Sequence, residues 1–242
     1  MATPRVALVT GGGTRVGRAI ATALGADGWR VAVHYNASAE GARECVAAIR
    51  DAGGAAAAFR ANLTRPGAPA RLVSRAAAQW GRLDLLVNSA ASMMRTPLAD
   101  VDEGDWDDVM ALNLRAPFFC AVAAAAAMGR RGGVVVNICD HMAFESWPEF
   151  IPHGVSKAGV DAMTRALAAA LAPRVRVNAV VPGFVLAPAG YARTKQRAFA
   201  RATPLRKLGT PADVAGAVRY LADATYVTGA TLFVDGGRHG AR

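Results

Sequence analysis

The amino-acid sequence predicts a single-domain α/β protein built on a doubly wound parallel sheet of about seven strands, with helices on both faces. Short apolar runs alternate with longer segments of helical spacing from one end of the 242-residue chain to the other. These runs are apolar at nearly every position, as in strands buried on both faces of a parallel sheet. With 53% hydrophobic and 19% charged residues, the chain suits one domain, 1–242, with a large core.

Each element is placed from its local pattern. Apolar runs predict strands at 6–10, 30–35, 55–62, 83–88, 132–139, 174–181 and 230–234. Helical spacing predicts helices at 15–27, 39–52, 68–80, 105–128, 151–172 and 211–221. Strands joined through helices pair in parallel by right-handed crossovers. Such sheets bind ligands in the crevice at the carboxyl ends of their strands, so we expect the functional site there.

Charge and cysteine usage narrow the class of protein. The net charge is +10, but the arginines are scattered and no basic run interleaves with aromatic residues, so we expect no nucleic-acid partner. No apolar run reaches the roughly 20 residues of a membrane span, and the N-terminus enters a strand at once, which predicts neither a membrane anchor nor a signal peptide. Cys45, Cys120 and Cys139 fit neither a disulfide set nor a metal site. We therefore expect a cytoplasmic protein without a metal.

A glycine cluster follows the first predicted strand, in "VALVTGGGTRVGRAIA" at 6–21. Glycine lets the backbone approach a phosphate closely, and a helix N-terminus offers free N–H groups and the positive end of its dipole. Between a first strand and a first helix, this cluster predicts a dinucleotide-binding loop rather than a structural turn. The second strand ends in "HYNAS", which has no carboxylate for ribose hydroxyls. With Arg15 nearby, this favours NADPH over NADH.

The spacing Thr10-Gly11-x-x-x-Arg15-x-Gly17 resembles the Thr-Gly-xxx-Gly-x-Gly signature of short-chain dehydrogenases/reductases. Arg15 in place of the middle glycine, and the "HYxxS" pattern, are similar to the pteridine reductase branch. Three further segments match the family in order along the chain: "MALNLRAPF", "VRVNAVVPGF" and "YVTGATLFVDGG". The resemblance implies a Rossmann fold, a nicotinamide cofactor, a small-molecule substrate, and a homotetramer assembled through the fourth and fifth helices.

The predicted cofactor contacts follow the loops at the strand ends. Asn62 stands where the family usually has an acid beside the adenine, and "NSAAS" keeps the family's asparagine as Asn88. The residues expected to bind NADPH are Gly11, Thr14, Arg15, Val16, Gly17, His34, Tyr35, Asn36, Ser38, Asn62, Leu63, Asn88, Ala90, Lys157, Pro182, Gly183 and Val185.

The family uses an asparagine, a serine, a tyrosine and a lysine for catalysis, and the resemblance carries these roles to four positions. Asn113 and Lys157 match the family. Asp140 stands at the serine position, where pteridine reductases also have an aspartate. His153, four residues before Lys157 and on the same helical face, stands where the tyrosine proton donor is expected. No pteridine reductase feature explains this histidine.

Histidine can take over the proton transfer, because it titrates near ~6.5 and works as either acid or base. An ionised Asp140 in contact with His153 would favour the imidazolium, which can donate a proton to an oxygen or a ring nitrogen. We therefore predict an NADPH-dependent reductase of a C=O or C=N bond. Two alternatives stay open: a non-redox isomerase or lyase with His153 as base, and a weakly active NADPH-binding regulatory protein. A metal site at Asp140, His141 and His153 has no compact ligand spacing to support it.

The segment 184–210 is expected to close over the substrate as a lid, by analogy with the family. It carries six cations, Arg193, Lys195, Arg197, Arg201, Arg206 and Lys207. They form either a solvated helix face or a surface that attracts an anionic substrate. Six large apolar residues could line a pocket for a planar pterin or an aromatic ketone: Met93, Met94, Phe144, Trp147, Phe150 and Phe184.

Overall fold

A computed structural model of the chain describes residues 3–187 and 190–241. Its centre is one parallel sheet of seven strands in the order β3-β2-β1-β4-β5-β6-β7. The strands are β1 (Val6–Val9), β2 (Arg30–Tyr35), β3 (Ala55–Arg60), β4 (Leu85–Asn88), β5 (Gly133–Ile138), β6 (Val175–Pro182) and β7 (Thr231–Val234). The predicted fold class is confirmed, and the sheet order reverses direction between β1 and β4.

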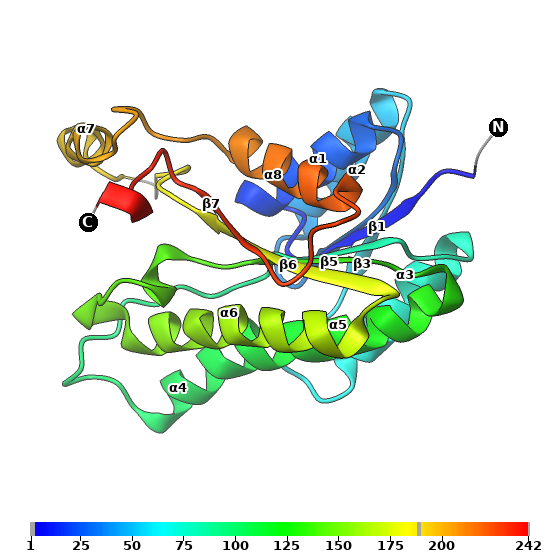
Figure 1. The fold of residues 1–242 in the computed structure, drawn as a ribbon, viewed down its shortest axis with the longest axis horizontal. Coiled ribbons are helices and arrows are strands. Elements are labelled where there is room, and N and C mark those ends of the chain that lie inside the picture. The colour runs from blue at the N-terminus through cyan, green and yellow to red at the C-terminus, as the bar shows by residue number, and fades with distance from the viewer. Residues whose placement is uncertain (1–2, 188–189, 242) are drawn as a thin grey trace.

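Helices cover both faces of this sheet (Figure 1). They are α1 (Arg15–Ala26), α2 (Ala39–Asp51), α3 (Ala68–Trp80), α4 (Glu103–Met110), α5 (Ala116–Met128), α6 (Ile151–Leu171), α7 (Arg193–Ala202) and α8 (Pro211–Asp223). Helices α1, α2 and α8 bury one apolar face of the sheet, and α3, α5 and α6 bury the other. This arrangement leaves the carboxyl ends of the strands to the connecting loops.

The predicted continuous helix 105–128 is interrupted by one wide turn. Ala111–Arg115 forms a π-helical turn between α4 and α5. Pro117 has no N–H group, so it cannot donate to the carbonyl of Asn113 four residues earlier. The proline ring would also clash with that carbonyl in a regular α-helix. A π-helical turn avoids the clash and accommodates the missing hydrogen bond, and such turns often mark functional sites.

The stretch Glu103–Arg131 is the one helical segment within the described part of the chain that is long and apolar enough to cross a membrane. Composition alone does not assign it there. Its α5 portion contributes buried side chains to the core beside α3 and the sheet. The predicted lid also gains a helix of its own, α7, which lies beside the C-terminus at one end of the molecule (Figure 1). Positions 188 and 189 of that lid lie outside the described residues.

Candidate active site

A cavity of about 900 Å³ lies at the carboxyl ends of the strands, next to the point where the sheet order reverses. Of the residues predicted from sequence, its wall contains Gly11, Thr14, Arg15, Val16, Gly17, His34, Tyr35, Asn36, Ser38, Asn62, Leu63, Ala90, Asp140, His153, Lys157, Pro182, Gly183 and Val185. Asn88 and Asn113 lie behind this wall. Both asparagines hold other residues of the site in place through hydrogen bonds.

The glycine loop forms one end of the cavity. Gly11 has φ +64°, and a Cβ on Gly17 would lie 2.3 Å from the Gly11 carbonyl oxygen, so the loop needs glycine at both positions. Among the described residues no side chain caps the N-terminus of α1, which leaves the N–H groups of its first turn to an anionic ligand. Arg15 has φ +51°, a left-handed conformation that costs a side-chain-bearing residue about 1 kcal/mol. The loop thus fits a phosphate, and Arg15 occupies a position that glycine would fill without strain.

His34 has a different environment from its neighbours in "HYNAS". Tyr35, Asn36 and Ser38 lie at the rim of the cavity, whereas His34 is only 2% exposed. Gly11 N donates to His34 Nδ1 over 3.1 Å, and His34 Nε2 lies 3.0 Å from the Ala61 carbonyl oxygen. Both ring nitrogens are therefore occupied by backbone groups. The geometry does not favour the predicted direct contact between His34 and the cofactor.

Asn88 points into the core rather than into the cavity. Its Nδ2 donates to the Pro117 carbonyl and, over 2.9 Å, to Asn137 Oδ1, and Asn137 Nδ2 donates to Thr164 Oγ1. This buried chain joins β4, β5 and α6. The side chain of Asn88 therefore holds together the elements that carry the site, and its contact with the cofactor stays a prediction for the backbone alone.

Thr10 is a positioning residue that the predicted set omits. Its hydroxyl oxygen accepts hydrogen bonds from Ser89 N at 2.9 Å and Ala90 N at 3.0 Å. These bonds fix the start of the loop after β4 against the glycine loop. Thr10 opens the glycine motif, and this place in the motif is the sequence signal that could have identified it.

The candidate catalytic residues lie together in the first turns of α6 and the loops beside it. Lys157 is 5% exposed and donates through Nζ to the Ile138 carbonyl oxygen over 2.9 Å. His153, one turn earlier on α6, is 3% exposed, and its Nδ1 lies 2.9 Å from the Ser92 carbonyl oxygen. A carbonyl only accepts, so Nδ1 carries the proton in this contact.

The hydrogen bonds of Asn113 agree with this tautomer. Its two Nδ2 hydrogens have acceptors at the Ser92 carbonyl oxygen, 2.9 Å away, and at Ser156 Oγ, 3.1 Å away. The 3.3 Å approach of Nδ2 to His153 Nδ1 is therefore not needed as a hydrogen bond. Asn113 Oδ1 also accepts from Ser92 N at 2.8 Å. Asn113 thus orients Ser92, and Ser92 orients His153, with Nε2 as the nitrogen left for chemistry.

Asp140 faces that nitrogen. Its Oδ2 lies 3.7 Å from His153 Nε2, which is an ion-pair distance but too long for a hydrogen bond. Among the described residues Nε2 has no hydrogen-bond partner. Burial raises the pKa of Asp140, but the facing His153 ring, the Met142 amide and Lys157 together hold it below its usual value. Burial also lowers the pKa of Lys157, which Asp140 partly offsets. The carboxylate is therefore poised to stabilise a cation on His153.

The substrate end of the cavity is aromatic and basic. Phe184 stacks on Phe199 of α7 with ring centroids 4.7 Å apart, and Tyr191 lies 5.4 Å from Phe184. Lys195 Nζ lies 5.9 Å above the Tyr191 ring. Met93, Trp147, Phe150 and Phe184 line the cavity as predicted; Met94 and Phe144 are not in its wall.

Arg238 also joins this wall, although it lies far away in sequence. Its Nη2 donates to Glu145 Oε2 over 2.9 Å, and its guanidinium lies 5.3 Å from the Phe199 ring. Glu145 also accepts from the Trp147 indole and faces His141. No local pattern brings Arg238 here, because only the fold places the C-terminal segment beside the loop after β5.

Comparison with known proteins decides the family. Residues 13–239 match the short-chain dehydrogenase family model described as enoyl-(acyl carrier protein) reductase. The chain belongs to the short-chain dehydrogenase/reductase family. It is 37% identical over 240 residues to a 3-oxoacyl-[acyl-carrier-protein] reductase of Synechocystis, covering 97% of each chain. It is 38% identical over 242 residues to 3β-hydroxysteroid dehydrogenase 1 of Eggerthella lenta, covering 96% of this chain and 93% of the other.

A solved structure agrees with this assignment. The Sinorhizobium meliloti protein described as a short-chain alcohol dehydrogenase superposes with a TM-score of 0.93 at 35% identity, covering 100% of this chain and 98% of the other. As a short-chain dehydrogenase/reductase, the chain is an oxidoreductase by family. The pteridine reductase-like branch and the histidine at position 153 as proton donor stay predictions.

Proposed function

We propose that this chain is a cytoplasmic NADPH-dependent reductase that delivers hydride to a C=O or C=N bond of a small, planar or anionic substrate. The observation that carries the proposal is the Nε2 of His153, which has no hydrogen-bond partner among the described residues and lies 3.7 Å from Asp140 Oδ2, in the same cavity wall as Lys157. A bound nicotinamide cofactor would supply the hydride. The chain itself supplies the proton: the Ser92 carbonyl, which Asn113 holds in place, orients the ring through Nδ1. Asp140 stabilises the imidazolium from the other side.

Asp140 is the member of the pair that the cavity reaches. Its side chain is 32% exposed, whereas that of His153 is 3% exposed. In the proposed route the buried Nε2 gives its proton to the Asp140 carboxylate, and the resulting carboxylic acid gives a proton to the substrate, which leaves Asp140 ionised and His153 neutral. The aromatic rings of Phe184, Tyr191 and Phe199, with Lys195 beside them, favour a flat substrate that carries negative charge. A pterin with an anionic, folate-like tail or an aromatic ketone that carries a carboxylate has this character.

A spectroscopic screen tests the redox function. The protein is mixed with NADPH and, in turn, dihydropterins, quinones and ketoacyl thioesters, and the nicotinamide absorbance band is followed. Loss of the band with one class supports the proposal and names the class. Turnover of a substrate with the band intact supports the isomerase or lyase alternative, in which neutral Nε2 acts as the base. Tight NADPH binding without any turnover supports the regulatory alternative.

Replacing Arg15 with glycine is expected to weaken NADPH binding about tenfold and to leave NADH binding nearly unchanged. Glycine accepts the φ of +51° without strain, so the loop keeps its shape while the guanidinium is lost. Fluorescence titration with both nucleotides measures the two affinities. Arg18→Gly is the control, since Arg18 lies one turn along α1 and pairs with Glu44 instead. An equal loss for both nucleotides would contradict the 2′-phosphate role of Arg15.

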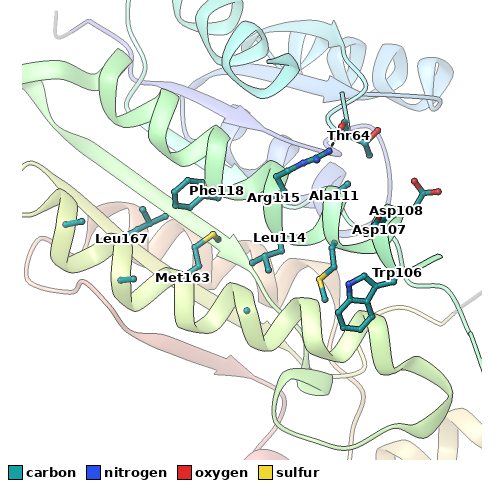
Figure 2. Close-up of a pocket in the computed structure, with 14 residues that line it drawn as sticks. Thr64, Trp106, Asp107, Asp108, Ala111, Leu114, Arg115, Phe118, Met163 and Leu167 are labelled. Carbon is teal, nitrogen blue, oxygen red and sulfur yellow. Dashed lines mark hydrogen bonds between the residues drawn. The ribbon is translucent and has the colours of Figure 1, made fainter. Parts of the chain in front are cut away.

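We also propose a homotetramer, and one helical face supports it. A hollow of about 1140 Å³ lies over α4, α5 and α6, lined by Trp106, Leu114, Phe118 and Met163 (Figure 2). Phe118 is 40% exposed and Phe119 next to it is 50% exposed, which leaves a large apolar surface in contact with water. The hollow also carries both acidic and basic side chains, which can pair across a two-fold axis in a second copy.

The variant Phe118→Glu is expected to shift the protein from tetramers to smaller species, because a carboxylate would be buried without a partner at the interface. Light scattering after size-exclusion chromatography measures the mass. Leu98→Glu is the control: Leu98 is 70% exposed and does not line the hollow. A wild-type protein that elutes as a monomer would contradict the proposed assembly.

A further inference from the structure

His34 connects three segments of the nucleotide-binding edge. It is the second-last residue of β2 and is almost completely buried. Its Nδ1 accepts the Gly11 amide over 3.1 Å, and its Nε2 lies 3.0 Å from the Ala61 carbonyl oxygen after β3. Its own carbonyl oxygen accepts the Gly12 amide over 2.9 Å. One residue therefore binds two successive amides of the glycine loop.

These contacts allow only one protonation state. An amide N–H can only donate and a carbonyl oxygen can only accept, so Nδ1 is bare and Nε2 carries the proton. This is a neutral imidazole. A second proton on Nδ1 would face the Gly11 N–H, replacing attraction by repulsion at the start of the loop.

The Gly11 backbone leaves little room to adjust. Gly11 has φ +64°, and the position of its absent Cβ lies 3.0 Å from Ala90 Cα on the other side of the loop. The loop is thus held between His34 on one side and the segment after β4 on the other. The amides that an incoming pyrophosphate would meet follow directly from Gly11.

We propose that neutral His34 is a positioning residue that holds the glycine loop open for the pyrophosphate of the cofactor, and that it makes no contact with the 2′-phosphate. This inference rests on the proposed nucleotide binding. Because the pyrophosphate is common to NADPH and NADH, loss of the His34 ring weakens both nucleotides by the same factor. A residue that bound the 2′-phosphate would instead weaken NADPH alone.

The position also makes the loop sensitive to acid. Burial lowers the pKa of His34, which its bond to Ala61 only partly offsets. Within the described part of the chain no carboxylate contacts the His34 ring: Phe59 of β3 lies opposite His34, and Arg75 of α3 lies over the Phe59 ring. The neighbouring pair Tyr35 and Arg60 points to the opposite face of the sheet. The neutral His34 ring contributes fully to the stability of the folded protein above the ordinary histidine pKa of ~6.5. That contribution is lost as pH falls below this value, because the unfolded chain then takes up a proton more readily than the folded one.

Fluorescence titration of NADPH and NADH tests the proposal with two variants. His34→Leu removes both ring contacts and is expected to weaken both nucleotides about tenfold, with their ratio unchanged. His34→Gln keeps an acceptor and a donor but does not titrate. As pH falls below the ordinary histidine pKa of ~6.5, the wild type is expected to lose affinity for NADH, which has no 2′-phosphate, while His34→Gln loses much less.

Two results would overturn the positioning role. The first is a loss confined to NADPH in His34→Leu, and the second is the same acid dependence in the wild type and His34→Gln. If the wild type binds neither nucleotide, the proposed function fails on its own. The positioning role of His34 is then tested by thermal unfolding of the cofactor-free protein. We expect acid to lower the melting temperature of the wild type more than that of His34→Gln, and equal shifts would refute the role.

Discussion

Replacing His153 with phenylalanine is expected to lower kcat roughly 10²–10⁴-fold, the usual contribution of a positioned general acid. Phenylalanine keeps the planar ring and the packing but has no Nε2 from which to donate. The Ser92 carbonyl keeps a donor in Asn113 Nδ2, so the substitution leaves no unpaired carbonyl behind His153. NADPH affinity should change little, because His153 is one turn from Lys157 and bonds to the protein rather than to the nucleotide loops. Steady-state kinetics and a fluorescence titration measure the two quantities separately.

The pH profile distinguishes an acid from a space-filling residue. If a histidine is the proton donor, reduction fades as pH rises, because only the imidazolium form carries a proton on Nε2 to donate. His153→Tyr restores the residue expected in the family, and its profile should extend to higher pH, since tyrosine titrates near ~10. Asp140→Asn removes the carboxylate that lies 3.7 Å from His153 Nε2 and is expected to lower kcat, because the imidazolium formed during proton transfer loses its facing negative charge. Full activity in His153→Phe would show that the proton comes from another group.

Local pattern was sufficient for the framework of this site. The succession of strands and helices along the chain follows from apolar runs separated by helical segments, and the glycine cluster lies where a first strand meets a first helix. The family's spacing of thirteen residues places Asp140 and His153 in one predicted catalytic set. It does not tell whether the two side chains meet, and the structure places Asp140 Oδ2 3.7 Å from His153 Nε2. These features depend on neighbours in the chain or on the family's fixed spacing.

Features that depend on direction or on distant segments could not be read this way. His34 and Asn88 are polar residues at strand ends, and the sequence does not tell which face they enter; both turn inward. The tautomer of His153 is set by a backbone carbonyl, that of Ser92, which no side-chain pattern reveals. Arg238 and Phe199 reach the cavity only because the C-terminal segment and α7 fold over it.

Replacing Lys157 with methionine is expected to lower kcat/KM by about 10²–10³-fold or more. The substitution removes the only amine of the predicted catalytic set. Methionine keeps the apolar stem, and the resemblance assigns the lost ammonium to the nicotinamide ribose, so nucleotide affinity should fall as well. Lys207→Met is the control, since Lys207 is exposed on a turn outside the cavity. Retained activity in Lys157→Met would remove the basis for the family mechanism in this chain.

The same substitution should not cost stability, and its pH dependence shows why. Burial lowers the pKa of Lys157, so folding disfavours its charged form. The methionine variant loses the bond to the Ile138 carbonyl, about 1–3 kcal/mol, but no longer buries an ammonium, which costs several kcal/mol. We therefore expect an equal or higher free energy of unfolding for the variant at about pH 7. The free energy of unfolding of the wild type should rise relative to that of the variant as pH increases toward the ordinary lysine pKa of ~10.4. Above that pH the lysine is neutral in the folded and in the unfolded protein, so its burial no longer removes a charge from water. Denaturant titrations at neutral and alkaline pH measure this gap. A variant that is destabilised most strongly at neutral pH would mean that the Lys157 ammonium stabilises the fold, and that the site carries no cost in stability for its chemistry.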